Sequence, residues 1–293
     1  MSYCKKKIFL TGGTGLIGTE VIECLKAQNF DVYGLTTGDN VSGNGVHWIK
    51  GNLFNYSEIQ KIIHEISPEY LLNFAWCAKG DYLTSPLNRE FQQAGLALLK
   101  SFHRAGGKRA IYAGTCFEYD FKDTPLKETD MIKPKTLYAK CKNELRIDAE
   151  RYAQNGISFG WGRIFYVFGK NEHSKRLTAS IINSLHENKK ITISTSHLKK
   201  DYMYTKDIAG AFISFLKSDV IGPVNICTGH AISVGDFAKI IAHKMKKTQF
   251  LELKNEKTDQ PEIIVGDNMK LIYEIGYHVL YDYEKAIEEI LGE

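Results

Sequence analysis

The sequence has no closely spaced cysteines. It contains no CxxC motif or other cysteine spacing typical of a metal site, and its six cysteines are spread along the chain as Cys4, Cys24, Cys77, Cys116, Cys141 and Cys227. A chain of 293 residues, 43% of them hydrophobic, has enough apolar material to form a core without disulfides. We therefore expect reduced thiols, a cytoplasmic location and no bound metal.

Long apolar runs and long runs of one charge sign are also missing. No apolar stretch approaches the roughly 20 residues that cross a membrane, and the opening "MSYCKKKIFL" leads directly into a glycine-rich loop, which leaves no room for a signal peptide. The 38 basic and 34 acidic residues are interspersed and give a formal net charge of +4. We expect neither a membrane nor a nucleic acid as a partner.

Short β-branched or aromatic runs alternate with longer helical patterns as far as residue 164. This alternation is typical of βαβ units and predicts an α/β fold with a Rossmann-type doubly wound parallel sheet. Strands are expected at residues 7–11, 31–35, 46–50, 70–74, 109–114 and 158–164, and helices from near Leu16, Ser57, Asn88 and Lys135.

The pattern loosens after Arg163 and then predicts a helix at 178–187 and a strand at 189–193. We predict two domains on this basis. The first is an NAD(P)-binding Rossmann domain over residues 1–165, with a return segment near 200–228. The second is a smaller C-terminal substrate-binding α/β domain formed by residues 166–199 and 229–293.

A glycine-rich stretch, "TGGTGLIG", occupies residues 11–18 between the first expected strand and the first expected helix. Gly13, Gly15 and Gly18 have G-x-G-x-x-G spacing, and Gly12, Gly15 and Gly18 have G-x-x-G-x-x-G spacing. Either arrangement lets the chain turn sharply and lets the backbone approach a pyrophosphate at the helix N-terminus. The strand before it and the helix after it favour a dinucleotide site over a plain tight turn.

The second expected strand bears on which dinucleotide binds. NAD sites tend to carry an acid at the carboxyl end of this strand, but the only acid in the strand here, Asp31, stands at its start. Leu35, Thr36 and Thr37 stand at its end, and threonine hydroxyls donate hydrogen bonds to a 2′-phosphate without repelling it. We therefore predict NADP(H), with NAD as the alternative.

Tyr138 and Lys142 are four residues apart in "LYAKCK", which places them on one helix face. An ammonium beside a phenol lowers the pKa of the phenol, as a general acid or base requires. Thr115 ends the fifth expected strand, at the sheet edge where open α/β sheets bind ligands.

The glycine loop, Thr115 and the Tyr138–Lys142 pair together resemble the extended branch of the short-chain dehydrogenase/reductase superfamily, the NAD(P)-dependent nucleotide-sugar epimerase, dehydratase and reductase family. The resemblance covers nearly the whole chain. It implies that Thr115 holds the reacting sugar oxygen, that Tyr138 donates the proton and that Lys142 assists it. It also implies a homodimer packed through the helices that carry Asn88 and Tyr138.

The resemblance extends to the cofactor and substrate contacts. Asn52 stands where the family has an acid after the third strand, and "NFAW", residues 73–76, matches the fourth-strand motif. The implied cofactor-binding residues are Gly12, Gly15, Leu16, Ile17, Thr36, Thr37, Asn52, Leu53, Phe74, Ala75, Trp76, Tyr138, Lys142 and Ile164. The implied contacts to a nucleotide-diphosphate sugar are Lys79, Tyr82, Cys116, Phe117, Tyr166, Lys170, Arg176, Lys200 and Asp201.

The residues after Thr115 indicate which reaction to expect. Sugar 4,6-dehydratases of the family have Asp and then Glu there, whereas this chain has Cys116 and Phe117, and a phenylalanine cannot move a proton. Glu118 stands one residue late, on the opposite face of an extended segment, and is interpreted as structural or as an anchor of the cofactor loop.

We therefore predict NADPH-dependent reduction of the 4-keto group of a nucleotide-linked 6-deoxy sugar, with Tyr138 as the general acid. The pairing of "NFAWCAKGDYLTSPLNREF" with "AGTCFEYD" also resembles reductase-like members from surface-polysaccharide gene sets. The alternatives are a nucleotide-sugar 4-epimerase with tightly bound NAD and a catalytically inactive dinucleotide-binding sensor or scaffold.

Overall fold

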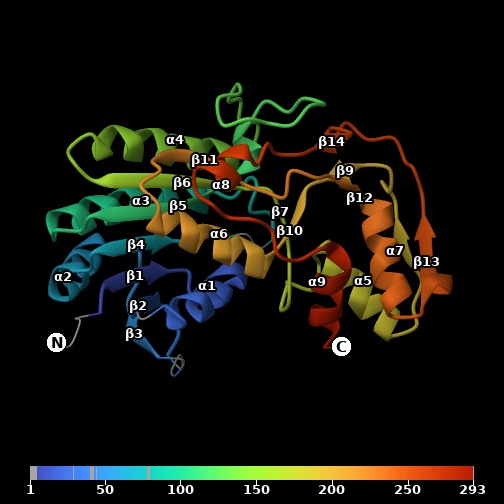
Figure 1. The fold of residues 1–293 in the computed structure, drawn as a ribbon, viewed down its shortest axis with the longest axis horizontal. Helices are drawn as coiled ribbons and strands as arrows, with labels where there is room; N and C mark the ends of the chain where they lie inside the picture. Colours follow the sequence, from blue (N-terminus) through green and yellow to red (C-terminus); the bar gives the residue numbers. More distant parts are fainter. Residues whose placement is uncertain (1–4, 29, 40–42, 44, 78–79, 293) are drawn as a thin grey trace.

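The computed structural model describes residues 5–28, 30–39, 43, 45–77 and 80–292. Its largest element is a seven-stranded sheet in the order β11-β6-β5-β4-β1-β2-β3, in which every neighbouring pair is parallel (Figure 1). The strands are β1 (Lys7–Thr11), β2 (Asp31–Thr36), β3 (Val46–Lys50), β4 (Tyr70–Asn73), β5 (Arg109–Thr115), β6 (Ser158–Ile164) and β11 (Gly222–Ile226). The prediction of a Rossmann-type α/β fold is confirmed.

Helices cover both faces of this sheet. One face carries α1 (Leu16–Lys26) and α6 (Thr205–Lys217), and the other carries α2 (Tyr56–Ile66), α3 (Leu87–Arg104) and α4 (Leu137–Ala153). Side chains cap two of these helices, because Asn55 accepts from the Glu58 amide and Thr136 from the Ala139 amide. The observed element ends differ from the predicted ones by one or two residues.

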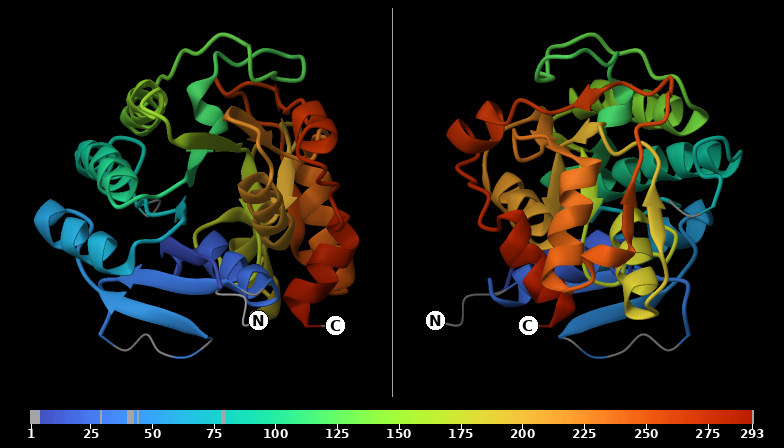
Figure 2. Two further views of the ribbon diagram at one scale, coloured as in Figure 1. Left: turned by 60° about the vertical axis from the view of Figure 1, so that its left-hand side comes forward. Right: turned by 90° about the vertical axis from the view of Figure 1, so that its right-hand side faces the viewer.

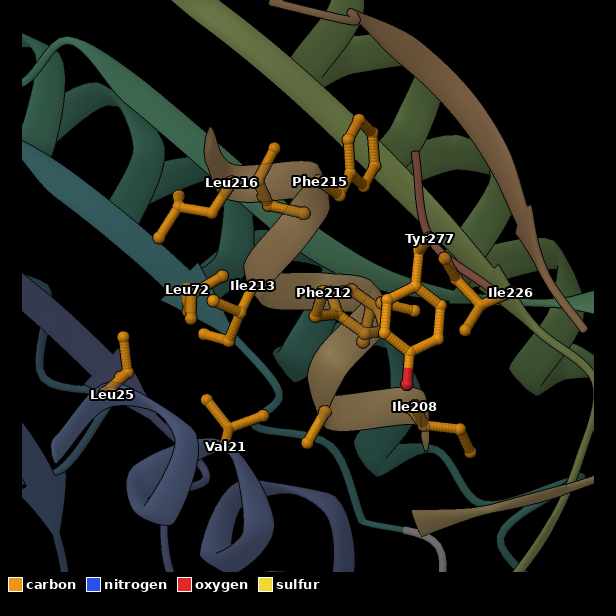
Figure 3. Close-up of a cluster of buried hydrophobic side chains, with 14 of the residues drawn as sticks. Val21, Leu25, Leu72, Ile208, Phe212, Ile213, Phe215, Leu216, Ile226 and Tyr277 are labelled. Atoms are coloured by element: carbon orange, nitrogen blue, oxygen red, sulfur yellow. The ribbon is translucent and has the colours of Figure 1, made fainter. Parts of the chain in front are cut away.

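The core between α1, α6 and the sheet fixes the position of the glycine loop. Figure 3 shows Val21 and Leu25 of α1 facing the side chains of α6, with Leu72 of β4 beside them. Phe212 and Phe215 of α6 are fully buried in the same cluster. Burial of such side chains is worth about 1.5–3 kcal/mol each, so α1 is held firmly against the end of β1.

Most of the remaining elements form a second group with its own apolar cluster. It contains α5 (Leu177–His186), α7 (Val234–Lys244) and α9 (Tyr283–Leu291), and Figure 2 shows α7 and α9 lying side by side. Its small sheets are β10 (Tyr202–Tyr204) with β7 (Tyr166–Phe168), β8 (Ile191–Ile193) with β13 (Leu251–Leu253), and β12 (Ile232–Ser233), β9 (Lys199–Lys200) and β14 (Ile263–Ile264). The short helix α8 (Met269–Tyr273) packs instead beside β11 of the main sheet, and its Leu271 belongs to the core that contains α1 and α6.

The chain alternates between the two groups of elements. It leaves the main sheet after β6, returns to it for α6 and β11, and ends with α9 in the second group. The expected return near 200–228 corresponds to this passage, and the division into two domains stays a prediction. Across the described residues, no helix combines the length and the apolar character needed to cross a membrane.

Candidate active site

A cavity of about 680 Å³ lies at the carboxyl edge of the main sheet, where the second group of elements meets it. Its wall includes the glycine loop, the ends of β4 and β5, the start of α4 and the segment between β7 and α5. Of the residues predicted to bind or react, the wall contains Gly12, Gly15, Leu16, Ile17, Phe74, Trp76, Tyr82, Thr115, Phe117, Tyr138, Lys142, Ile164, Tyr166 and Arg176.

The glycine loop has the shape that a pyrophosphate requires. Gly12 has φ +74°, and a side chain there would meet the backbone of Phe74 at 2.6 Å, while one at Gly18 would meet the Gly12 carbonyl at 2.1 Å. Gly15 is exposed and is itself part of the cavity wall, and a side chain there would lie 3.2 Å from the Gly12 carbonyl oxygen. No side chain caps the first turn of α1, so its amide groups and the helix dipole are free to bind an anion. These residues fit a dinucleotide.

The other predicted cofactor-binding residues, Thr36, Thr37, Asn52, Leu53 and Ala75, are not part of the cavity wall, and their contact with a cofactor stays a prediction. The Thr36 hydroxyl accepts from the Gly38 amide, and Thr37 is exposed. Asp31 hydrogen-bonds Tyr33 and His47 at the opposite end of β2. Asn52 accepts from the Phe54 amide, Leu53 is buried, and the Ala75 amide donates to Asn73.

Sequence reasoning missed one cation at the carboxyl ends of β2 and β3. Lys50 is the neighbour of Thr36 in the β2–β3 register, its side chain is exposed, and it forms an ion pair with Asp39. The position of Lys50 depends on how β2 and β3 pair. A prediction of parallel pairing between these two strands would have placed Lys50 next to Thr36.

Tyr138 lies at the start of α4, next to residues 80–83, a segment that forms part of the cavity wall. Its amide donates to the Leu83 carbonyl, and its ring is edge-on to the rings of Tyr82, at 5.1 Å, and Trp76, at 6.0 Å. Burial raises the pKa of Tyr138 above its usual range, and the neighbouring Thr115 hydroxyl lowers it in part. Tyr138 is therefore a protonated phenol beside Thr115.

Lys142 contacts Ala113 and Trp76 in this structure. Its Nζ donates to the Ala113 carbonyl at 2.7 Å and lies 4.0 Å from the centre of the Trp76 ring. Burial lowers the pKa of Lys142 to about 7, and Glu118 partly opposes that shift. Burial raises the Tyr138 pKa in this structure, and Lys142 is not among the groups that lower it, so the assisting role of Lys142 stays a prediction.

Glu118 is a structural anchor below the site, one of the two roles expected for it. Its carboxylate accepts from the Thr115 amide at 3.1 Å, from Trp161 Nε1 at 2.8 Å and from Arg163 Nε at 2.9 Å. A buried charge is tolerated when it is paired and hydrogen-bonded in this way. The network holds the turn after β5, η1 (Cys116–Glu118), in place.

Cys116 lies behind the cavity wall, whereas Phe117 is part of the wall. The Cys116 side chain is 1% exposed and packs with Tyr119, Leu126 and Phe165. Burial raises the pKa of its thiol well above the usual value. The expected substrate contact of Cys116 is therefore corrected, since the thiol is neutral and does not reach the cavity.

Two other predicted substrate contacts also have structural roles. Asp201 is fully buried and accepts from the amides of Thr228, Gly229 and Gly266, which join β9 and β10 to distant loops. Lys200 is buried, and its Nζ donates to the Pro261 carbonyl at 3.1 Å.

Two expected substrate contacts remain, Lys170 and Lys79. Lys170 is exposed and is not part of the cavity wall. Lys79 lies outside the described residues. The wall also contains residues that sequence reasoning missed, and no local pattern marks them: Glu172, Thr178 and Tyr202. Across the part of the chain that the structure describes, no group of three or more His, Cys, Asp and Glu side chains is arranged to hold a metal ion.

A glycine loop at the edge of a parallel sheet, with a tyrosine and a lysine beside a strand-end threonine, defines a dinucleotide-dependent α/β enzyme. The model of the NAD dependent epimerase/dehydratase family matches residues 8–227 of this sequence. The chain belongs to that family, which confirms the resemblance inferred from its motifs.

Individual relatives are distant, but several of them cover nearly the whole chain. UDP-glucuronic acid decarboxylase 1 of Danio rerio is 21% identical over 98% of this chain and 72% of its own. CDP-abequose synthase of Salmonella typhimurium is 23% identical over 99% of both chains. The solved UDP-glucose 4-epimerase of Thermotoga maritima, crystallised with UDP-glucose, has a TM-score of 0.88 at 18% identity over 98% of both chains. Such similarity supports the shared fold.

Proposed function

We propose that this protein reduces the 4-keto group of a nucleotide-linked 6-deoxy sugar with NADPH. The observation that carries the proposal is the protonated Tyr138 phenol beside Thr115, in a wall that presents Phe117 and not a second acid at the next exposed position. A reduction must begin with a proton donor at the substrate oxygen, whereas an oxidation must begin with a base.

Thr115 and Tyr138 have different roles in the proposed reduction. Bound NADPH supplies the hydride that adds to the carbonyl carbon. The Thr115 hydroxyl donates a hydrogen bond to the carbonyl oxygen, and Tyr138 transfers its phenolic proton to that oxygen as the hydroxyl of the product forms. The rings of Trp76, Tyr82 and Phe117 line this region, and with substrate bound they would keep water from it.

The preference for NADPH over NADH is part of the proposal. The carboxyl ends of β2 and β3 present Thr36, Thr37 and the Lys50 ammonium, while the strand's own acid, Asp31, is at the far end. A 2′-phosphate carries negative charge, so it would compete with Asp39 for the Lys50 ammonium and could accept from the exposed Thr37 hydroxyl, which favours it over a bare ribose hydroxyl.

A 4-epimerase with tightly bound NAD is the second candidate, because the solved structure of a UDP-glucose 4-epimerase superimposes on nearly the whole chain. A dinucleotide-binding sensor without activity is the third. Its supporting observation is that Lys142 is engaged by Ala113 and Trp76.

The deciding experiment measures NADPH absorbance with a panel of UDP-, dTDP-, GDP- and CDP-linked 4-keto-6-deoxy sugars. The CDP compounds are included because one relative is a CDP-abequose synthase. The proposal expects NADPH consumption equal to product formed. Product without NADPH consumption identifies an epimerase, and NADPH binding without any product identifies a sensor.

The place and assembly of the enzyme follow from the same proposal. We expect a cytoplasmic enzyme of surface-polysaccharide biosynthesis that forms a homodimer through α3 and α4. These helices pack against each other on the outer face of the sheet, and Ile147 of α4 is 39% exposed there. Sedimentation of the purified protein and of Ile147→Lys tests this assembly, since a charge at a dimer interface would give monomers.

A further inference from the structure

Asn88 is a buried residue at the start of α3 whose side-chain amide joins two parts of the cavity wall. The residue is 2% exposed. Its Oδ1 atom accepts from Trp76 Nε1 at 2.7 Å, and its Nδ2 atom donates to the Tyr82 carbonyl at 2.6 Å and to the Ser85 carbonyl at 2.8 Å. The side chains of Trp76 and Tyr82 both line the cavity. One amide therefore connects two wall residues that are separate along the chain.

The chemistry of the three partners requires an amide at position 88. The indole of Trp76 can only donate, and the carbonyls of Tyr82 and Ser85 can only accept. A side-chain amide offers one acceptor oxygen and two N–H donors, so it satisfies all three partners at once. A carboxylate offers no donor, and a leucine of similar size offers neither donor nor acceptor. Substitution by leucine would leave all three partners without this bond.

The bond to Trp76 fixes the indole where it contacts Lys142 and Tyr138. Lys142 Nζ lies 4.0 Å from the centre of the indole ring, and the Tyr138 ring is edge-on to it with the ring centres 6.0 Å apart. Phe91 of α3 stacks on the indole at 5.4 Å. Stacking holds the plane of the ring but leaves it free to slide, whereas the directional bond to Asn88 fixes its position within that plane.

The bond to Tyr82 holds the segment at residues 80–85 against the start of α4. The Tyr138 amide donates to the Leu83 carbonyl at 3.0 Å, and the rings of Tyr82 and Tyr138 are 5.1 Å apart. Asn88 binds the carbonyl of the same residue whose ring makes this contact. A shift of the segment would therefore move a direct neighbour of the Tyr138 phenol.

Asn225 of β11 has the same set of hydrogen bonds in a place away from the cavity. It is fully buried, accepts from the Tyr119 hydroxyl at 2.7 Å, and donates to the carbonyls of Leu126 at 2.7 Å and Asp267 at 3.2 Å. None of these three partners lines the cavity. Asn225 therefore joins distant segments only, whereas Asn88 joins two residues of the wall.

We propose that Asn88 is a positioning residue of the candidate active site. Its Oδ1 atom keeps the Trp76 indole over the Lys142 ammonium. Its Nδ2 atom keeps the Tyr82 ring against Tyr138. A misplacement of reacting groups by about 1 Å can cost about a hundredfold in rate, so these contacts affect turnover although Asn88 is not itself part of the cavity wall. The inference rests on the proposed function for the reaction whose turnover is measured.

The first measurement is the turnover of Asn88→Leu, which keeps the size of the side chain and removes all three bonds. With the 4-keto-6-deoxy nucleotide sugar that wild type reduces, we expect kcat per folded molecule to fall about tenfold to hundredfold. Asn225→Leu is the matched control, because it removes the same set of bonds from another buried amide. Both variants should lose stability in urea, but Asn225→Leu should keep kcat per folded molecule within about threefold.

The second measurement follows the Trp76 indole directly and needs no substrate. The chain has 3 tryptophans, so NMR of protein with isotope-labelled tryptophan gives one indole N–H resonance for each, and Trp76→Phe identifies that of Trp76. Asn88→Leu should move this resonance away from its hydrogen-bonded position. Asn88→Asp keeps an acceptor and should leave the indole hydrogen-bonded, but it has no donor for the Tyr82 carbonyl and should still lower kcat.

The outcomes separate a positioning role from a structural one. Wild-type kcat in Asn88→Leu, or a loss no larger than that in Asn225→Leu, would overturn the inference, as would an unmoved Trp76 resonance in Asn88→Leu. If wild type epimerises a nucleotide sugar without consuming NADPH, the proposed reduction fails, and epimerase turnover of the same variants then decides the role of Asn88. If wild type turns over no nucleotide sugar, both the proposed function and the inference fail.

Discussion

The ammonium of Lys142 lies over the face of the Trp76 indole, 4.0 Å from the ring centre. This contact stabilises the charged form of a lysine whose pKa burial has lowered to about 7. The same Nζ donates to the Ala113 carbonyl and so joins α4 to the end of β5. The charge state of Lys142 near neutral pH therefore depends on its aromatic neighbour.

A pH profile of kcat/KM for NADPH tests this dependence, because that constant reports the pKa values of the free enzyme. The wild-type value falls as the pH rises through about 7, where Lys142 loses its proton. Trp76→Leu removes the stabilising ring, lowers the Lys142 pKa further and moves the falling limb to lower pH. Trp76→Phe keeps an aromatic ring at this position, so it shifts the falling limb by a smaller amount. If the falling limb lies at the same pH in Trp76→Leu as in wild type, the indole does not stabilise the charged form of Lys142.

Tyr138→Phe tests the proton donor. Removing the phenolic hydroxyl leaves the ring contacts with Tyr82 and Trp76 but takes away the proton that the product oxygen requires. We expect turnover to fall by about 10²- to 10⁴-fold, with NADPH affinity unchanged. Tyr82→Phe is the matched control, a second phenol in the same wall, and should retain most activity. Normal turnover in Tyr138→Phe would remove this residue from the mechanism.

The elements that sequence reasoning located are those whose signals are local. The glycine loop is recognisable because turn, phosphate contact and helix start all lie within residues 11–18. A structural role for Glu118 was one of the two that the sequence suggested, but its premise is wrong, because residues 116–118 form the 3-10 helix η1 and not an extended segment. In the structure that carboxylate is buried against Trp161 and Arg163.

Residues that were missed or misassigned depend on distant parts of the chain. Asp201 matches a family segment, but its partners include the Gly266 amide, 65 residues further on, and these bonds draw it away from the cavity. Lys50 becomes a candidate cofactor contact only because the β2–β3 register places it beside Thr36. Glu172 stands in a segment without periodicity, and only the folded structure shows that it is part of the cavity wall.

Lys50→Ala tests the cofactor preference. If the Lys50 ammonium attracts the 2′-phosphate, its loss raises the KM for NADPH about tenfold and leaves the KM for NADH unchanged. Lys61→Ala is the matched control, since Lys61 is an exposed lysine of α2 and its removal changes the net charge equally. Asp39→Asn releases Lys50 from its ion pair and should lower the KM for NADPH. Equal effects of Lys50→Ala on both cofactors would contradict the assignment.

Glu118→Gln tests the anchor below the catalytic threonine. The substitution keeps the size of the side chain but leaves the buried Arg163 guanidinium, 1% exposed, without its counter-charge. Breaking a buried pair in this way typically costs about 3–5 kcal/mol.

We therefore expect a clear drop in the free energy of unfolding, measured by urea denaturation. Because the Glu118 carboxylate also accepts from the Thr115 amide, residual activity should fall further than the loss of folded protein explains. Glu187→Gln, at an exposed acid, serves as the control and should change neither quantity. A variant as stable as wild type would mean that Tyr119 and the Glu128 carbonyl, the other partners of Arg163, suffice to hold its charge.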